Sequence, residues 1–192
     1  MQTLRTFIAI HLPEKLIAAL GDLIAGMPPE TGAVKWVKPE SIHITLKFLG
    51  DIMESQRPQI ESALENACAT TAPFALASGQ PGAFANWRKP NVFWVGVTGS
   101  EPDWAAMLQL QSAIEAQLEA IGFPRENRRF KPHLTIGRVK NPHQTAAIVE
   151  HLRTKTFPEI AIPVASVHLM KSELTRQGAI YSVLKSVNLQ KT

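Results

Sequence analysis

The chain contains one short pattern twice, in which a histidine and a threonine are separated by an aliphatic residue. The two copies are His43-Ile44-Thr45-Leu46 and His133-Leu134-Thr135-Ile136, and they lie 90 residues apart in a sequence of 192. Side chains of an extended strand alternate between two faces, so the histidine and threonine of each copy share a face. The repeat therefore predicts two half-buried strands, about 42–49 and about 132–139, in two related halves of one fold.

The residues around the first copy extend this alternation. Ile42 and Phe48 fall in phase with the aliphatic residues of the motif, whereas Lys47 falls in phase with the histidine and the threonine. A period of two with one apolar side is typical of a strand that packs one face on a core. We therefore expect Phe48 to be buried and Lys47 to lie on the polar face.

The remaining periodicity gives the two halves the same order of elements: strand, helix, motif strand, helix, strand. The predicted ranges are strand 4–10, helix 13–25, helix 54–69 and strand 74–78 around the first motif, and strand 92–97, helix 103–121, helix 141–152 and strands 164–171 and 180–189 around the second. A pseudo-twofold arrangement of the halves would make the polar sides of the two motif strands face one groove. Alternation of strands and helices alone would favour a parallel α/β sheet.

Composition limits the class of protein. No apolar run reaches the roughly 20 residues that cross a membrane, so we expect no membrane association. The single cysteine, Cys68, cannot form an internal disulfide, which fits a reducing compartment such as the cytoplasm, and it lies on the apolar stripe of a predicted helix. The net charge of +4 permits a polyanionic partner. A chain of this length fits one domain or two small packed lobes, and nothing in it demands more than a monomer.

Two histidines and two threonines suit the cleavage of a phosphodiester that has a neighbouring hydroxyl, or of a cyclic phosphate. One imidazole removes a proton from the attacking oxygen while the other protonates the leaving oxygen. Threonine hydroxyls donate to the non-bridging phosphate oxygens. The sequence has no dense set of metal ligands, no GxxxxGK[ST] loop and no GxGxxG, so we expect no cofactor.

Further contacts with a substrate are expected from cations and aromatic residues near the motifs. Arg129 and Lys131 lie in a basic segment that leads into the second motif, and Arg138 follows that motif. Phe7, in the first predicted strand, is a candidate for stacking on a base, which is worth ~1–3 kcal/mol per base. Trp36 and Phe130 also lie near the motif strands, and the sequence leaves their roles open.

These residues resemble those of the two-histidine phosphoesterase superfamily, and within it the bacterial RNA 2′,3′-cyclic phosphodiesterase family, also called the 2′-5′ RNA ligase family. The resemblance covers nearly the whole chain. It rests on the two motifs and on the segments Arg5-Thr6-Phe7-Ile8-Ala9-Ile10, Trp36-Val37-Lys38-Pro39, Val92-Phe93-Trp94-Val95-Gly96-Val97, Phe130-Lys131-Pro132 and Ser172-Glu173-Leu174 with Gly178 and Tyr181.

The resemblance implies an α+β fold, in which a duplicated βαβαβ unit forms two pseudo-twofold lobes with antiparallel sheets around a central cleft. Residues 1–192 would then form a single bilobal domain. It also implies hydrolysis of a terminal RNA 2′,3′-cyclic phosphate to a 2′-phosphomonoester, on substrates that include tRNA fragments. His43 would be the proton donor, His133 the proton acceptor, and Thr45 and Thr135 the phosphate ligands.

Two alternatives stay open at this stage. One is ATP-independent 2′-5′ ligation, and the other is a nucleotide- or RNA-binding module without catalysis. The family often has arginine where this chain has Lys131, and lysine lacks the bidentate fork of arginine. Arg129 or Arg138 could supply that contact instead.

Overall fold

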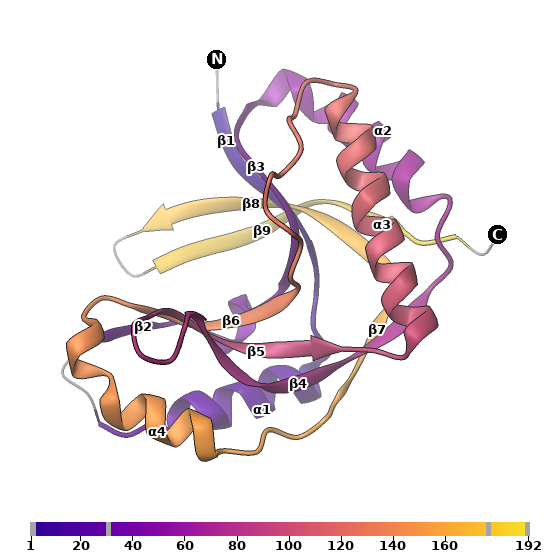
Figure 1. Cartoon of the computed structure of the whole chain (residues 1–192). Helices are drawn as coiled ribbons and strands as arrows, with labels where there is room; N and C mark the ends of the chain where they lie inside the picture. The colour runs from indigo at the N-terminus through magenta and orange to yellow at the C-terminus, as the bar shows by residue number, and fades with distance from the viewer. Residues whose placement is uncertain (1–2, 30–31, 176–177, 191–192) are drawn as a thin grey trace.

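The computed structural model describes residues 3–29, 32–175 and 178–190 (Figure 1). Its helices are α1 (Glu14–Ala25), α2 (Arg57–Cys68), α3 (Glu101–Glu119) and α4 (Ala146–Thr154), with 3-10 turns at Pro39–Ser41, Glu54–Gln56 and Pro142–Gln144. Its strands are β1 (Thr3–Ile10), β2 (Val34–Trp36), β3 (Ile44–Met53), β4 (Phe74–Ala85), β5 (Pro90–Thr98), β6 (His133–Val139), β7 (Ala161–Val164), β8 (Ser166–Thr175) and β9 (Gly178–Asn188).

These strands form one nine-stranded sheet, in the order β7-β4-β5-β6-β3-β1-β8-β9, with β2 paired to β6. Each of these pairings is antiparallel, so the fold is α+β, as the family resemblance implies. Antiparallel strands need no helical crossover, and alternation along the chain therefore did not indicate strand direction. The parallel alternative is wrong.

The two halves of the chain exchange their third strands. β4 belongs to the first half in sequence but pairs with β5, and β8 belongs to the second half but pairs with β1. The sheet is consequently symmetric about its centre, where the motif strands β6 and β3 are neighbours. This exchange brings residues of each sequence half next to the motif of the other half.

The helices cover the sheet in two pairs. α2 and α3 run side by side and contact β9, β3 and β4, while α4 contacts β4 and lies with α1 at the opposite end of the view (Figure 1). Their apolar stripes bury the side chains of one sheet face, and Cys68 is fully buried among them, as expected. Within the described residues, no helix has the length and apolar character that a bilayer crossing requires.

A bulge in β3 overturns the predicted phase after the first motif. Ala9 of β1 pairs with Thr45 and Ile8 pairs with Lys47, so Leu46 is an extra residue in β3. An extra residue reverses the faces of the side chains that follow it. Phe48, which we expected to be buried, is therefore 60% exposed on the motif face, and Lys47 points into the interior.

The buried Lys47 ammonium is hydrogen-bonded to polar partners. Its Nζ donates to Glu115 Oε2 of α3 at 2.6 Å and to the carbonyl of Pro124 at 2.8 Å. Gln111 Nε2 donates to the other carboxylate oxygen of Glu115 at 3.2 Å. A buried charge is tolerated only with such partners, so the bulge requires the acid that α3 supplies.

Candidate active site

The two motifs meet at the centre of the sheet. Ile44 of β3 pairs with Leu134 of β6, and both aliphatic side chains are fully buried. Alternation then places the motif histidines and threonines together on the opposite face. In this antiparallel register His43 lies across from Thr135, and Thr45 lies across from His133. The two histidines occupy a diagonal of this rectangle, so their Cα atoms are about 7–8 Å apart.

Each motif histidine is oriented by the backbone two residues before it. His43 Nδ1 lies 2.8 Å from the carbonyl oxygen of Ser41, and His133 Nδ1 lies 2.7 Å from that of Lys131. A carbonyl oxygen only accepts, so Nδ1 carries the proton in both rings. Nε2 of each neutral imidazole is then the unprotonated nitrogen, which can accept a proton and can deliver one only after the ring has become charged.

An apolar bed supports the His43 ring. Phe7 stacks on it with ring centroids 4.7 Å apart, and Tyr181 meets it edge-on at 5.3 Å. Phe7 forms a small buried cluster with Ala9 and Met170 that is separate from the main core. At 3% exposure, Phe7 lies beneath the imidazole, a position in which it fixes the ring and removes water from it.

His133 also contacts an aromatic side chain. The ring of Phe84 contacts it edge-on, with centroids 4.9 Å apart. Phe84 lies in β4, which reaches the second motif only because the halves exchange their third strands. Nothing local in the sequence indicates this contact. Tyr181, the only tyrosine of the chain, reaches His43 through the same exchange.

Burial lowers the pKa of both motif histidines. The pKa of His43 falls to about 4, chiefly through desolvation, although the Ser41 carbonyl raises it, and His11, Arg138 and His133 lower it further. The pKa of His133 is lowered by desolvation and by Arg138, against the opposing effect of the Lys131 carbonyl. Without an anion between them, both rings are neutral at pH 7.

A second bulge brings Arg138 to the motif face. Thr135 pairs with Trp94 and Gly137 with Phe93, so Ile136 is an extra residue in β6, just as Leu46 is in β3. Phe48 and Arg138 therefore occupy equivalent positions, each three residues after its motif threonine. Arg138 is exposed and lowers the pKa of both motif histidines, so its charge is felt at the centre of the site.

The other two cations named from the sequence lie outside the strands. Arg129 and Lys131 are exposed in the segment between α3 and β6. The contact of Lys131 with His133 is made by its backbone carbonyl. The structure thus brings together His43, His133, Thr45, Thr135, Phe7 and Arg138, whereas Arg129 and Lys131 have exposed side chains in the segment before β6.

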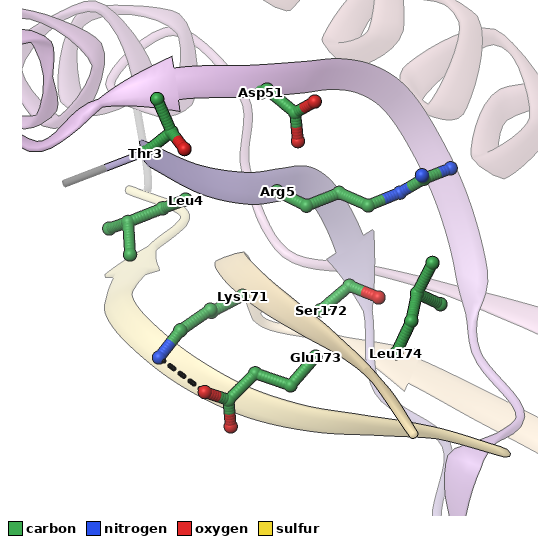
Figure 2. A pocket seen from close by; sticks show the side chains of 8 residues that line it. All are labelled: Thr3, Leu4, Arg5, Asp51, Lys171, Ser172, Glu173 and Leu174. Atoms are coloured by element: carbon green, nitrogen blue, oxygen red, sulfur yellow. Dashed lines mark hydrogen bonds and ion pairs between the residues drawn. The ribbon is translucent and has the colours of Figure 1, made fainter. Parts of the chain in front are cut away.

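A cavity of about 400 Å³ lies between β1, β3 and β8 (Figure 2). Two cations and two carboxylates are among its lining residues: Arg5, Lys171, Asp51 and Glu173. Lys171 Nζ is 2.8 Å from Glu173 Oε1, so that pair neutralises itself. With no net positive charge, this cavity is a poorer phosphate site than the face that carries Arg138.

The antiparallel fold and its paired histidine-threonine strands define a two-histidine phosphoesterase. The sequence of residues 30–176 matches the family model of the 2′-5′ RNA ligase superfamily. The chain belongs to this family.

Several relatives support the same assignment. An RNA 2′,3′-cyclic phosphodiesterase of Methanothermobacter thermautotrophicus is 32% identical over 96% of this chain and 98% of its own length, and one of Archaeoglobus fulgidus is 34% identical over 95% and 98%. Among solved structures, TT0787 of Thermus thermophilus has a TM-score of 0.73 at 29% identity, covering 96% of this chain and 97% of its own. E. coli LigT complexed with 3′-AMP has a TM-score of 0.75 at 25% identity, covering 99% and 100%.

Proposed function

We propose that this protein hydrolyses the terminal 2′,3′-cyclic phosphate of RNA to a 2′-phosphomonoester, with two histidines as acid and base and no metal. The observation that carries the proposal is the register at Ile44 and Leu134, which places two imidazoles on a diagonal with a threonine across from each. Relatives that share about a third of its residues over nearly their full lengths are named RNA 2′,3′-cyclic phosphodiesterases. The sequence alternation and the family membership support the same reaction.

The reaction is an in-line displacement at phosphorus. His133 Nε2 removes a proton from water as the water oxygen forms the new bond to phosphorus. The bond from phosphorus to the 3′ oxygen breaks, and His43 Nε2 delivers a proton to that oxygen. The products are a free 3′ hydroxyl and a 2′-phosphate, and each imidazole ends in the protonation state opposite to the one in which it started.

The remaining side chains of this face stabilise the negative charge of the phosphate. Thr45 and Thr135 donate their hydroxyl protons to the non-bridging oxygens, one from each motif strand. Arg138 supplies the cation that the sequence left undecided among three candidates. A bound phosphate anion also favours the charged form of His43 and raises its pKa from the low value of the free protein. Substrate binding and loading of the general acid are thereby coupled.

The test is an assay on EDTA-treated protein with an oligoribonucleotide that ends in a cyclic phosphate. We expect full turnover to a 2′-phosphate, and a loss of ~10²–10⁴ in rate for His43→Ala and for His133→Ala, since each removes acid or base catalysis. His143→Ala, at an exposed histidine outside the site, is the matched control. A 3′-phosphate product, or near-normal turnover in either motif variant, would contradict the assignment.

A second candidate function is favoured by the family to which the chain belongs. In 2′-5′ ligation the 5′ hydroxyl of another RNA takes the place of water and attacks the phosphorus of the cyclic phosphate. The bond from phosphorus to the 3′ oxygen breaks as in hydrolysis, and the same base and acid serve this step without ATP. RNA halves with a cyclic phosphate and a free 5′ hydroxyl distinguish the two reactions by product. A protein that binds RNA with a cyclic phosphate end but neither hydrolyses nor ligates it would be a binding module.

The finer assignments belong to the same proposal. Residues 1–192 act as a single bilobal unit, as a monomer in the cytoplasm, on RNA fragments that include tRNA pieces. The continuous sheet through β3 and β6 supports the single unit. Light scattering of the purified protein tests the monomer, and a molecular mass of twice 21.1 kDa would overturn it.

A further inference from the structure

Two histidines that belong to neither motif are stacked on each other beside the site. The rings of His11 and His168 have centroids 4.0 Å apart and an interplanar angle of 14°. His11 follows the end of β1 and His168 lies in β8, so residues 157 positions apart in sequence form one two-ring stack. The reaction described above uses neither ring.

Strand register places this stack next to His43. Ile10 pairs with Ile44, so His11, the next residue along, lies beside His43 on the motif face. His168 pairs with Ala9, which shares that face with Phe7. The electrostatic effect of His11 on the pKa of His43 agrees with this proximity. The stack therefore borders the position of the phosphate on the side away from β6.

Neighbouring side chains hold the two rings in place. His168 Nδ1 is 2.9 Å from Ser186 Oγ, and His168 Nε2 is 3.2 Å from Ser166 Oγ. His11 Nε2 is 3.3 Å from Met170 Sδ, at the margin of the apolar bed beneath His43. His11 itself is exposed. Because these contacts already order the rings, little conformational entropy is lost when a ligand binds on them.

Charge distinguishes this surface from the phosphate site. Desolvation lowers the pKa of His168 to about 4 and also lowers the pKa of His11, whose ring is covered on one side by His168, so both rings are neutral at pH 7. Neutral stacked rings have little attraction for a phosphate, but they match the face of a nucleobase. RNA-binding proteins recognise unpaired bases by stacking them on aromatic side chains, histidine among them.

We propose that the His11–His168 stack is the platform for the nucleobase of the terminal nucleotide, the one that carries the cyclic phosphate. The proposal rests on the proposed function for the identity of the ligand. It makes His11 a residue that sets substrate affinity, while the motif histidines carry the proton transfers.

Calorimetric binding at pH 7 of adenosine 2′-monophosphate and of inorganic phosphate tests the platform without turnover. His11→Ala is expected to weaken nucleotide binding roughly 5- to 150-fold, the equivalent of ~1–3 kcal/mol of base stacking, and to leave binding of inorganic phosphate unchanged. His11→Phe retains a flat ring and should recover most of the affinity. His143→Ala, which removes an exposed histidine elsewhere, is the matched control and should bind both ligands normally.

Three results would overturn the platform. The first is unchanged nucleotide affinity in His11→Ala, and the second is an equal loss for both ligands, which would place the role of His11 on the phosphate or on His43. The third is a wild-type protein that binds the nucleotide no tighter than inorganic phosphate. Failure of the proposed function looks different, because the wild-type protein would then bind the nucleotide selectively but turn over no cyclic phosphate.

Discussion

Anion binding at the motif face should be accompanied by proton uptake at His43. The free ring has a pKa of about 4. At pH 5 it is therefore protonated in only about a tenth of the molecules. A bound anion a few ångströms away raises such a pKa by about 1–3 units. Binding at pH 5 should then transfer about 0.4–0.9 proton from buffer to His43.

Sulfate is the appropriate probe, because it mimics phosphate and does not titrate near pH 5. Calorimetry of sulfate binding in buffers of different ionisation enthalpy gives the number of protons taken up. His43→Gln keeps a polar side chain of similar size and removes the titrating group, so the difference between wild type and variant isolates His43. Equal proton uptake by the two proteins would refute the coupling. An NMR titration that places the free His43 midpoint at 6.5 or above would refute the low starting value.

Three further outcomes follow from the geometry. The value of kcat/KM for a cyclic mononucleotide should peak below pH 6.5, because burial lowers the pKa of both motif histidines; a maximum above pH 7 in the pH–rate profile would contradict this. His43 is neutral above pH 6.5 whether the chain is folded or unfolded, but between pH 6.5 and 4 the unfolded chain binds the extra proton. Urea denaturation should therefore show the free energy of unfolding falling by up to about 3 kcal/mol over that range, and His43→Gln should flatten the fall. Lys47→Met should cost about 3–5 kcal/mol of unfolding free energy because Glu115 stays buried without its partner, and Lys47→Met/Glu115→Leu should recover most of it in thermal denaturation; a double variant as unstable as the single one would disprove the pairing.

The sequence predicted the centre of the site because its determinants are local. A histidine and a threonine two residues apart in a strand share a face wherever that strand lies, so the alternation alone placed His43 with Thr45 and His133 with Thr135. The aliphatic residues between them identified the buried side in the same way. Repetition of the pattern indicated that the two strands would be related.

The positions after each motif could not be obtained in this way. A single extra residue in β3 moves Phe48 to the motif face and Lys47 to the interior, and a bulge has no reliable signature in the residues that form it. Extrapolating a period of two therefore failed one residue past the motif. The compensating acid, Glu115, lies in α3, far along the chain.

The surroundings of the histidines depend on long-range pairing. Phe84 reaches His133 and Tyr181 reaches His43 because β4 and β8 change places between the halves. The order of elements along the chain is compatible with either placement of these strands. Only the assembled sheet shows which aromatic ring desolvates which imidazole.

The equivalent positions of Phe48 and Arg138 bear on the orientation in which a ligand binds between the two motifs. A scaffold built from two matching halves would accept a ligand in either of two opposite orientations, and acid and base would then be interchangeable. A guanidinium on one side alone removes that ambiguity, since the anionic end of a nucleotide is attracted to Arg138 and finds the uncharged ring of Phe48 at the equivalent position on the other side. Which histidine acts as the acid and which as the base thus depends on the two side chains at which the copies differ. The histidines and threonines that the copies share need not differ.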